Sequence, residues 1–159
     1  MGTTANAGSK FSIGTTVGAG TIVADFTADT FVAIGNIKDM GEIGPKAEVL
    51  VSKYVDQTYS RKMKGSRDNG SLTLLVERDS TDVGYIALIA AEKTSYAYNF
   101  CVELNDKPST GSSPKNSKFY FKAIVSSAST KLGGPDDPVE TTFELAISGP
   151  IFEVAASAS

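Results

Sequence analysis

The stretch that decides the fold runs from residue 47 to residue 88 and reads AEVLVSKYVDQTYSRKMKGSRDNGSLTLLVERDSTDVGYIAL. It opens with the β-type run Glu48–Val55, and a long polar connection or hairpin follows over residues 56–70. The turn sequence Gly-Ser-Arg-Asp-Asn-Gly closes that connection and leads into Ser71–Glu77, where apolar residues alternate with polar ones. Such alternation predicts a half-buried strand.

A helix is predicted directly after this strand. Asp79-Ser80-Thr81-Asp82 supplies a cap residue and acids for the first turn, which suit the positive end of a helix dipole. Tyr85, Leu88 and Ile89 then recur at helical spacing, and Lys93 lies where a cation favours the last turn. We expect this to be the one helix of the chain.

Strand patterns dominate the rest of the sequence. Tyr96–Leu104, Phe119–Ser127 and Val139–Ile147 each alternate apolar and polar residues, and weaker strand signals lie at Thr30–Ile37 and Ile151–Val154. Regular alternation is typical of antiparallel strands with one buried and one wet face. The residues therefore predict an all-β fold with one flanking α-helix.

The pattern also divides the chain into three parts. Residues 1–30 are rich in glycine with scattered apolar anchors, which predicts a flexible N-terminal arm. That arm either orders against a partner or is a plain floppy terminus. Residues 31–154 form the β domain, and residues 155–159 are expected to be a frayed C-terminal tail.

Composition limits the classes of protein. The chain has 159 residues, of which 41% are hydrophobic and 21% charged, enough for one globular domain. A net charge of −3 argues against tight binding to duplex DNA. No secretory signal pattern occurs and no apolar run approaches the ~18 residues of a membrane span. These features predict a soluble protein made in the cytoplasm.

Catalytic chemistry is not indicated. Histidine is absent, which removes histidine-based acid–base catalysis and the commonest metal ligand. Cys101 is the single cysteine, so an intramolecular disulfide is excluded and a structural thiol is expected. Asp136-Asp137 and Asp79…Asp82 lack calcium-loop spacing and suit a turn and a cap. We expect no enzyme activity and no cofactor or metal, although sequence leaves open a glycosidase-type carboxylate pair.

The one notable charge cluster is basic. It comprises Arg61, Lys62, Lys64 and Arg67. Three interpretations remain open: a solvated loop, a nucleic-acid patch, or a contact with an acidic surface of a neighbouring copy.

A resemblance covers residues 31–154. The run FVAIGNIKDMGEIG at residues 31–44 resembles the start of many phage tail tube domains. The segments after it match the family's aromatic and basic segment, turn, strand, acidic helix entry and closing strands: Ala47–Thr58, Arg61–Gly65, Asp68-Asn69-Gly70, Ser71–Glu77, Asp79, Asp82, Gly84–Leu88, Phe119–Ser127 and Glu140–Gly149. On these residues the chain resembles the major tail tube protein of long-tailed, siphovirus-type bacteriophages. That family is related to the type VI secretion tube protein.

The resemblance implies an antiparallel β-sandwich or barrel-like tail tube fold. It also implies a structural virion protein that assembles into stacked hexameric rings, the conduit for DNA ejection. Its partners would be other copies of itself, a tape measure protein, a tail terminator and tail-tip proteins. DNA would pass through the lumen without specific binding, and no membrane would be involved. The protein would be assembled in the host cytoplasm and reside in the phage tail.

Two sets of site residues follow from that picture. Arg61, Lys62, Lys64 and Arg67 are candidates for an inter-ring contact. Glu103, Glu140 and Glu144 are candidates for the lumen wall, where negative charge would repel phosphate, or equally for an ordinary wet outer face.

The alternative function is a monomeric β-sandwich binding module for a carbohydrate or receptor. Such a module needs exposed aromatic residues in a groove. Most aromatic residues here fall on the apolar faces of their strands, namely Tyr98, Phe100, Phe119, Phe121 and Phe143.

Overall fold

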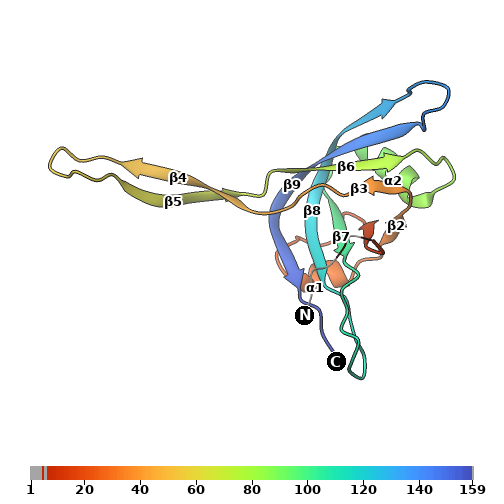
Figure 1. Cartoon of the computed structure of the whole chain (residues 1–159), viewed down its shortest axis with the longest axis horizontal. Helices are drawn as coiled ribbons and strands as arrows, with labels where there is room; N and C mark the ends of the chain where they lie inside the picture. Colours follow the sequence, from red (N-terminus) through yellow and green to blue (C-terminus); the bar gives the residue numbers. More distant parts are fainter. Residues whose placement is uncertain (1–4, 6, 159) are drawn as a thin grey trace.

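The computed structural model describes residue 5 and residues 7–158. Within them the chain forms strands and two helices, drawn in Figure 1. The elements are β1 (Lys10–Ile13), α1 (Val23–Thr27), β2 (Val32–Ile34), β3 (Ile37–Asp39), β4 (Lys46–Ser52), β5 (Arg61–Asp68), β6 (Ser71–Glu77), α2 (Val83–Glu92), β7 (Tyr98–Glu103), β8 (Lys118–Lys131) and β9 (Glu140–Val154).

Seven strands make one antiparallel sheet in the order β2-β1-β7-β8-β9-β6-β3. Its two edge strands, β2 and β3, are separated by only Gly35 and Asn36. The sheet must therefore curl until its edges approach each other, and the backbone N–H of Glu77 donates to the carbonyl of Asn36 near that junction (2.9 Å). The expected all-β, antiparallel, barrel-like class is confirmed.

The concave side of the sheet holds the main core, and α2 packs against β1, β2 and β8 to complete it. Asp82 caps the helix by accepting a bond from the Tyr85 N–H (3.1 Å). The same carboxylate accepts from the Gly35 N–H (3.0 Å), so the cap also ties the helix to the β2–β3 junction. The predicted helix and its cap are confirmed.

The N-terminal segment differs from the expected arm. Lys10–Ile13 is an interior strand between β2 and β7, and Phe11 is fully buried against the rings of Phe100 and Phe121. Residues 23–27 form a second, short helix whose Phe26 is also buried. The prediction of a segment without core elements is wrong here, because Phe11, Ile13 and Phe26 are buried against distant strands.

A second, smaller cluster lies on the convex side of the sheet, beneath α1. Phe26 stacks on Tyr120 at a ring-centroid distance of 5.7 Å, and Cys101 is buried with them. Burial raises the pKa of the Cys101 thiol and raises the pKa of Tyr120 to about 12. The predicted wet face of β7 and β8 is therefore wrong where α1 covers it.

The C-terminal part is also more ordered than expected. β9 runs without interruption through Ser148 to Val154, where the sequence predicted a break before a separate short strand. Ser157 forms a bridge with Lys115 of the β7–β8 loop, so residues expected to fray are paired. The predicted break is instead an irregularity in register beside Tyr120 and Lys122 of β8.

Candidate functional site

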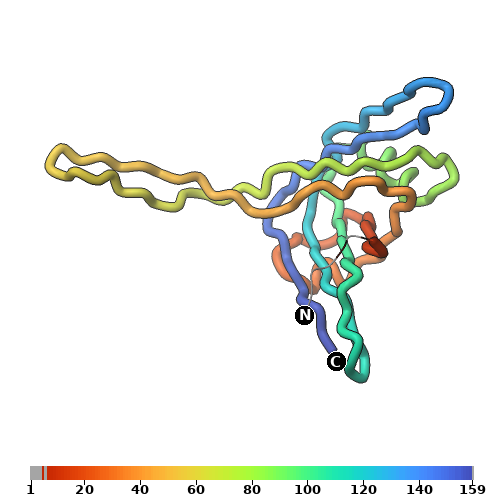
Figure 2. Tube along the Cα trace, viewed as in Figure 1, coloured from red at the N-terminus to blue at the C-terminus, as the bar shows by residue number. Residues whose placement is uncertain are grey.

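The most conspicuous feature is a long hairpin that projects from the body of the molecule. Figure 1 and Figure 2 show β4 and β5 leaving the barrel side by side and reaching far from every other element. They form a separate two-stranded sheet, and in the described residues each strand pairs only with the other. Residues 53–60 connect them at the tip.

The hairpin is unusually apolar for an element without cover. Large apolar side chains are at least half exposed along both strands and at the tip: Val49, Leu50, Val51, Tyr54, Val55, Tyr59 and Met63. A lone two-stranded hairpin is marginally stable in water, and exposed apolar residues on both faces give it no core. Contiguous exposure of this kind marks an interaction surface.

The predicted basic loop is a strand in the structure. Arg61, Lys62, Lys64 and Arg67 all lie on β5, opposite β4. The sequence interpretation failed because β5 carries charge at consecutive positions and so lacks the alternation of a half-buried strand. Its backbone bonds to β4 hold it extended, although neither face is buried.

A β-bulge sorts these cations onto one face. Val49 pairs with Lys64 and Ala47 with Arg67, so the two residues Gly65 and Ser66 stand opposite the single residue Glu48. Directly paired residues share a face, and alternate residues of β4 share a face. Arg67 is therefore on the same face as Lys64, whereas strict alternation along β5 would place it on the other.

The two faces consequently differ in charge. One carries three aliphatic residues of β4 and three cations of β5, namely Ala47, Val49, Val51, Lys62, Lys64 and Arg67; we call it the basic face. The other carries Leu50 opposite Met63 and Ser52 opposite Arg61. Arg61 is thus separated from the other three cations with which the sequence grouped it.

The three candidate glutamates do not form one cluster. Glu140 and Glu144 lie four residues apart on the convex face of β9, whereas Glu103 pairs with Lys118 at the opposite end of β8. Thirteen residues of β8 separate the two ends, which is roughly 40 Å of strand. The structure therefore places Glu140 and Glu144 on one face of the same strand and leaves Glu103 apart.

Their electrostatic surroundings differ as well. Glu140 accepts a bond from the Lys38 ammonium (2.5 Å), which also lies 3.8 Å from Glu77. The hydrogen bond to Glu140 raises the pKa of Lys38. Glu103 is held by Asn116 (2.9 Å) and Lys118 (3.9 Å). Glu144 is exposed and has no ion pair within 4.0 Å in the described chain.

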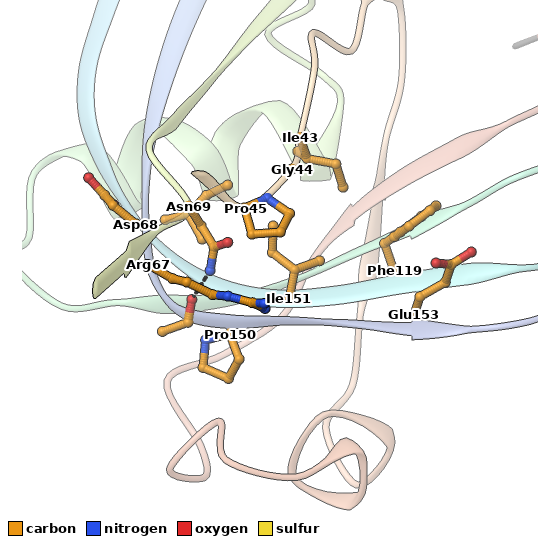
Figure 3. A pocket seen from close by; sticks show the side chains of 12 residues that line it. Ile43, Gly44, Pro45, Arg67, Asp68, Asn69, Phe119, Pro150, Ile151 and Glu153 are labelled. Atoms are coloured by element: carbon orange, nitrogen blue, oxygen red, sulfur yellow. Dashed lines mark hydrogen bonds between the residues drawn. The ribbon is translucent and has the colours of Figure 1, made fainter. Parts of the chain in front are cut away.

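A hollow of about 570 Å³ lies at the root of the hairpin, and Figure 3 shows its lining. The β3–β4 connection supplies Ile43 and Pro45, the end of β5 supplies Arg67, and β9 supplies Ile151 and Glu153. The Asn69 amide donates to the carbonyl of Gly149 and so fastens the root to β9. The lining is mixed, with apolar walls and charged groups at the rim.

Sequence reasoning did not identify either the projection or the hollow. One signal for the projection was present: Val49-Leu50-Val51 is a continuous apolar run, which is typical of a strand covered on both faces. The hollow had no such signal, because its walls come from four separate segments of the chain.

Other kinds of site find no support in the described residues. In them, no group of three or more histidine, cysteine, aspartate or glutamate side chains is placed to hold a metal ion. A search of the same residues for a helix with the length and hydropathy of a membrane span found none.

Comparison with known proteins connects this architecture to tubes. No protein-family model and no curated protein sequence matches the chain. Among solved structures, the SPP1 tail tube is similar with a TM-score of 0.65 at 16% identity, over 92% of this chain and 76% of that one.

Two further structures give the same TM-score over almost the whole of both chains. A chain from the baseplate of the anti-feeding prophage has a TM-score of 0.65 at 12% identity, covering 98% of each chain. A chain from the sheath/tube terminator of the extracellular contractile injection system PVC has a TM-score of 0.65 at 11% identity, covering 98% of this chain and 99% of that one. At these identities the similarity establishes the fold, and the fold of this chain is that of tail tube proteins.

Proposed function

We propose that this protein is a structural subunit that associates with copies of itself to build a tail tube. The observation that carries the proposal is the projecting hairpin, whose apolar side chains are exposed on both faces and at the tip. The shared fold with the SPP1 tail tube supports the same function. We further propose that the subunits form stacked hexameric rings through which DNA is ejected.

The physical reason is that no other described element packs against the apolar side chains of the hairpin. Burying apolar surface contributes about 25 cal/mol per Å², so an element with seven large exposed apolar residues gains most from a partner. The hairpin and the barrel present different surfaces, and contacts between unlike surfaces generate rings or open polymers rather than closed dimers. Repeated association would then supply the stability that a lone hairpin lacks.

Within that assembly we assign the basic face of the hairpin to the contact between rings. Lys62, Lys64 and Arg67 act together because the bulge places them side by side. Arg61, on the opposite face, contributes to a separate part of the contact. Neighbouring aliphatic residues bury surface while the cations select an acidic partner surface.

We assign the exposed Glu144 to the lumen wall, with Glu140 beside it and Glu103 at the other end of the sheet. A mildly negative wall repels phosphate and lets DNA slide. A tape measure protein, a tail terminator and tail-tip proteins are the further partners of such a tube. It would be assembled in the host cytoplasm and lie in the phage tail of the virion.

The decisive experiment is to purify the protein and follow it by light scattering with concentration and by negative-stain electron microscopy. We expect hollow tubes of uniform diameter made of six-fold rings. A protein that stays monomeric at high concentration would contradict the proposal and favour a monomeric binding module.

The role of the basic face is tested by replacing Lys62, Lys64 and Arg67 together by Glu. We expect a folded monomer, because all three side chains are exposed, but no tube growth. Arg61→Glu is the matched control on the other face and should weaken assembly less. Normal tubes from the triple variant would contradict the assignment of the basic face to the contact between rings, but would leave the proposed tube function standing.

A further inference from the structure

We propose that the tip of the hairpin in one copy seats in the hollow at the hairpin root of the next copy. The inference rests on the proposed tube function and names the surface that receives the hairpin. It follows from a projecting apolar tip and an open, half-apolar hollow on the same chain.

The tip is the most exposed apolar part of the molecule. Val55 is fully exposed, Tyr59 is 85% exposed and Tyr54 is 53% exposed. The residues that dominate the binding energy between proteins are enriched in tyrosine, and tyrosine suits a contact that is partly polar. Nothing in the described part of the chain covers these three residues, since β4 and β5 pair only with each other.

The hollow offers apolar walls of matching character. Ile43 and Ile151 are half-buried on opposite sides of it, and Pro45 and Pro150 add rigid apolar surface. A Cβ added to Gly44 or Gly149 would meet no atom within 4 Å, so the wall of the hollow is open at these two positions. A hollow of about 570 Å³ accommodates several side chains.

Charge is complementary between the two surfaces. The rim of the hollow carries the carboxylates of Asp68 and Glu153 and the guanidinium of Arg67. The tip carries Lys53 and Asp56, both exposed. One cation of the tip thus faces two carboxylates, and its one carboxylate faces a guanidinium, which favours this partner over a purely apolar peptide.

The contact must be between copies. About ten residues of extended chain separate Val55 from Pro45 at the root, a distance of roughly 30 Å. A hairpin held straight by its ladder does not fold back over that distance, and Figure 2 shows its tip remote from its own root. Because each copy offers one tip and one hollow, the contact is head-to-tail and continues from copy to copy.

The test is disulfide trapping in assembled tubes with the double variant Val55→Cys, Glu153→Cys. A disulfide forms only where two Cα atoms approach within about 4.4–6.8 Å. We expect mild oxidation to give a ladder of dimers, trimers and longer chains on a non-reducing gel. Val55→Cys with Leu132→Cys is the matched control, because Leu132 is exposed like Glu153 but lies in the β8–β9 turn.

Charge exchange gives an independent readout. Lys53→Glu and Glu153→Lys should each raise the concentration needed for assembly roughly fivefold, as reversal of an exposed interfacial pair does. The two substitutions combined should restore it toward the wild-type value. If the effects of Lys53→Glu and Glu153→Lys simply add in the double variant, the pairing of Lys53 with Glu153 is overturned.

The outcomes separate this contact from the tube itself. Tubes that form normally but give no ladder, or that cross-link as well through Leu132, would overturn the seating of the tip in the hollow and leave the tube function standing. A ladder that stops at the dimer would overturn the head-to-tail arrangement. A wild-type protein that forms no tubes would instead overturn the proposed function.

Discussion

At the scale of single residues, Asp29 and Asn99 fasten the N-terminal segment to the sheet. Asp29 accepts bonds from the Thr15 N–H and hydroxyl (2.7 Å each) and from the Asn99 amide (2.8 Å). Asn99 is fully buried and donates also to the carbonyl of Val17 (2.8 Å). Burial acts to raise the Asp29 pKa, but the hydrogen bonds from Thr15, Asn99 and Thr30 outweigh it and hold the pKa below its ordinary value.

Asp29→Asn should therefore destabilise the monomer by about 1–2 kcal/mol at neutral pH, because an amide group would face donors that now meet a carboxylate. The folded pKa is lowered, so this stabilisation is present above the unfolded pKa of about 3.9 and is lost as the pH falls through the folded value. Urea unfolding at several pH values measures it. The difference from wild type should shrink below about pH 4, whereas a constant difference would contradict the argument.

Exposed Asp136 provides the control for that measurement. It lies exposed in the β8–β9 turn, so Asp136→Asn should change stability by less than about 0.5 kcal/mol.

Some single residues have surroundings that the sequence could not predict. Cys101 and Tyr120 occupy polar positions in their strands by alternation, yet both are buried. Their cover comes from Phe26 of a five-residue helix, too short to leave a periodic pattern in the sequence. The network around Asp29 was likewise invisible, because its members are up to 84 positions apart along the chain.

At the scale of elements, α2 depends on a glycine for its approach to β2. A Cβ added to Gly84 would lie 2.4 Å from the Ala33 carbonyl oxygen and 2.6 Å from the Ile34 Cα. Both are backbone atoms, which do not move aside cheaply.

Gly84→Ala should accordingly destabilise the protein by about 1–3 kcal/mol, the cost of overpacking. Helix propensity alone predicts the opposite, a gain of about 1 kcal/mol. Thermal or urea unfolding decides between them, with Gly44→Ala as control because its Cβ would meet open space. A stabilised Gly84→Ala variant would show that helix and strand are free to separate.

The hairpin gives a prediction about assembly rather than stability. Val49→Thr with Val51→Thr should leave the free energy of unfolding of the monomer within about 0.5 kcal/mol, since both side chains are at least half exposed. The concentration needed for tube assembly should rise, because the variant loses apolar surface on the basic face. Light scattering against concentration measures it.

The control pair is Val83→Thr with Ile86→Thr on the exposed face of α2, where exposure is similar. Valine, isoleucine and threonine have similar helix propensity, so the helix is little affected. If both pairs raise the assembly concentration equally, the hairpin has no special role.

Elements with a clear period were those that sequence predicted best. Ser71–Glu77 and the helix capped by Asp82 occur where alternation and capping placed them. The projecting strand β5 and the interior strand β1 were missed for opposite reasons. β5 is a strand that buries neither face, and β1 buries residues but is only four residues long.

At the scale of the whole molecule, the chain has a curled, barrel-like sheet and one hairpin that lies outside it. The antiparallel class and the flanking helix follow from local patterns, but the order of strands in the sheet depends on β1 entering between β2 and β7. That pairing joins residues about 90 positions apart and has no local signature. The length of hairpin that projects likewise depends on where pairing with the seven-stranded sheet stops. That length sets how much surface the hairpin offers to another copy.

The contrast between a packed barrel and an uncovered hairpin predicts how a protease acts on the free and on the assembled protein. In the monomer, trypsin should cut first at Lys53, Arg61, Lys62 and Lys64, since the hairpin has no core and opens locally at low cost. The barrel should survive as two fragments held together by β1–β7 and β3–β6 pairing. Assembly should slow these cuts on the order of tenfold or more, because the hairpin is then covered.

Lys131, exposed at the β8–β9 turn, reports on general access of the protease. Mass spectrometry of the fragments over time, from monomer and from sedimented tubes, compares the two sets of sites in one sample. Protection confined to residues 53–64 would place the hairpin in the contact between copies. Equal protection at Lys131, or none at the hairpin, would mean that the tube is built through another surface and that the apolar residues of β4 and β5 stay exposed in it.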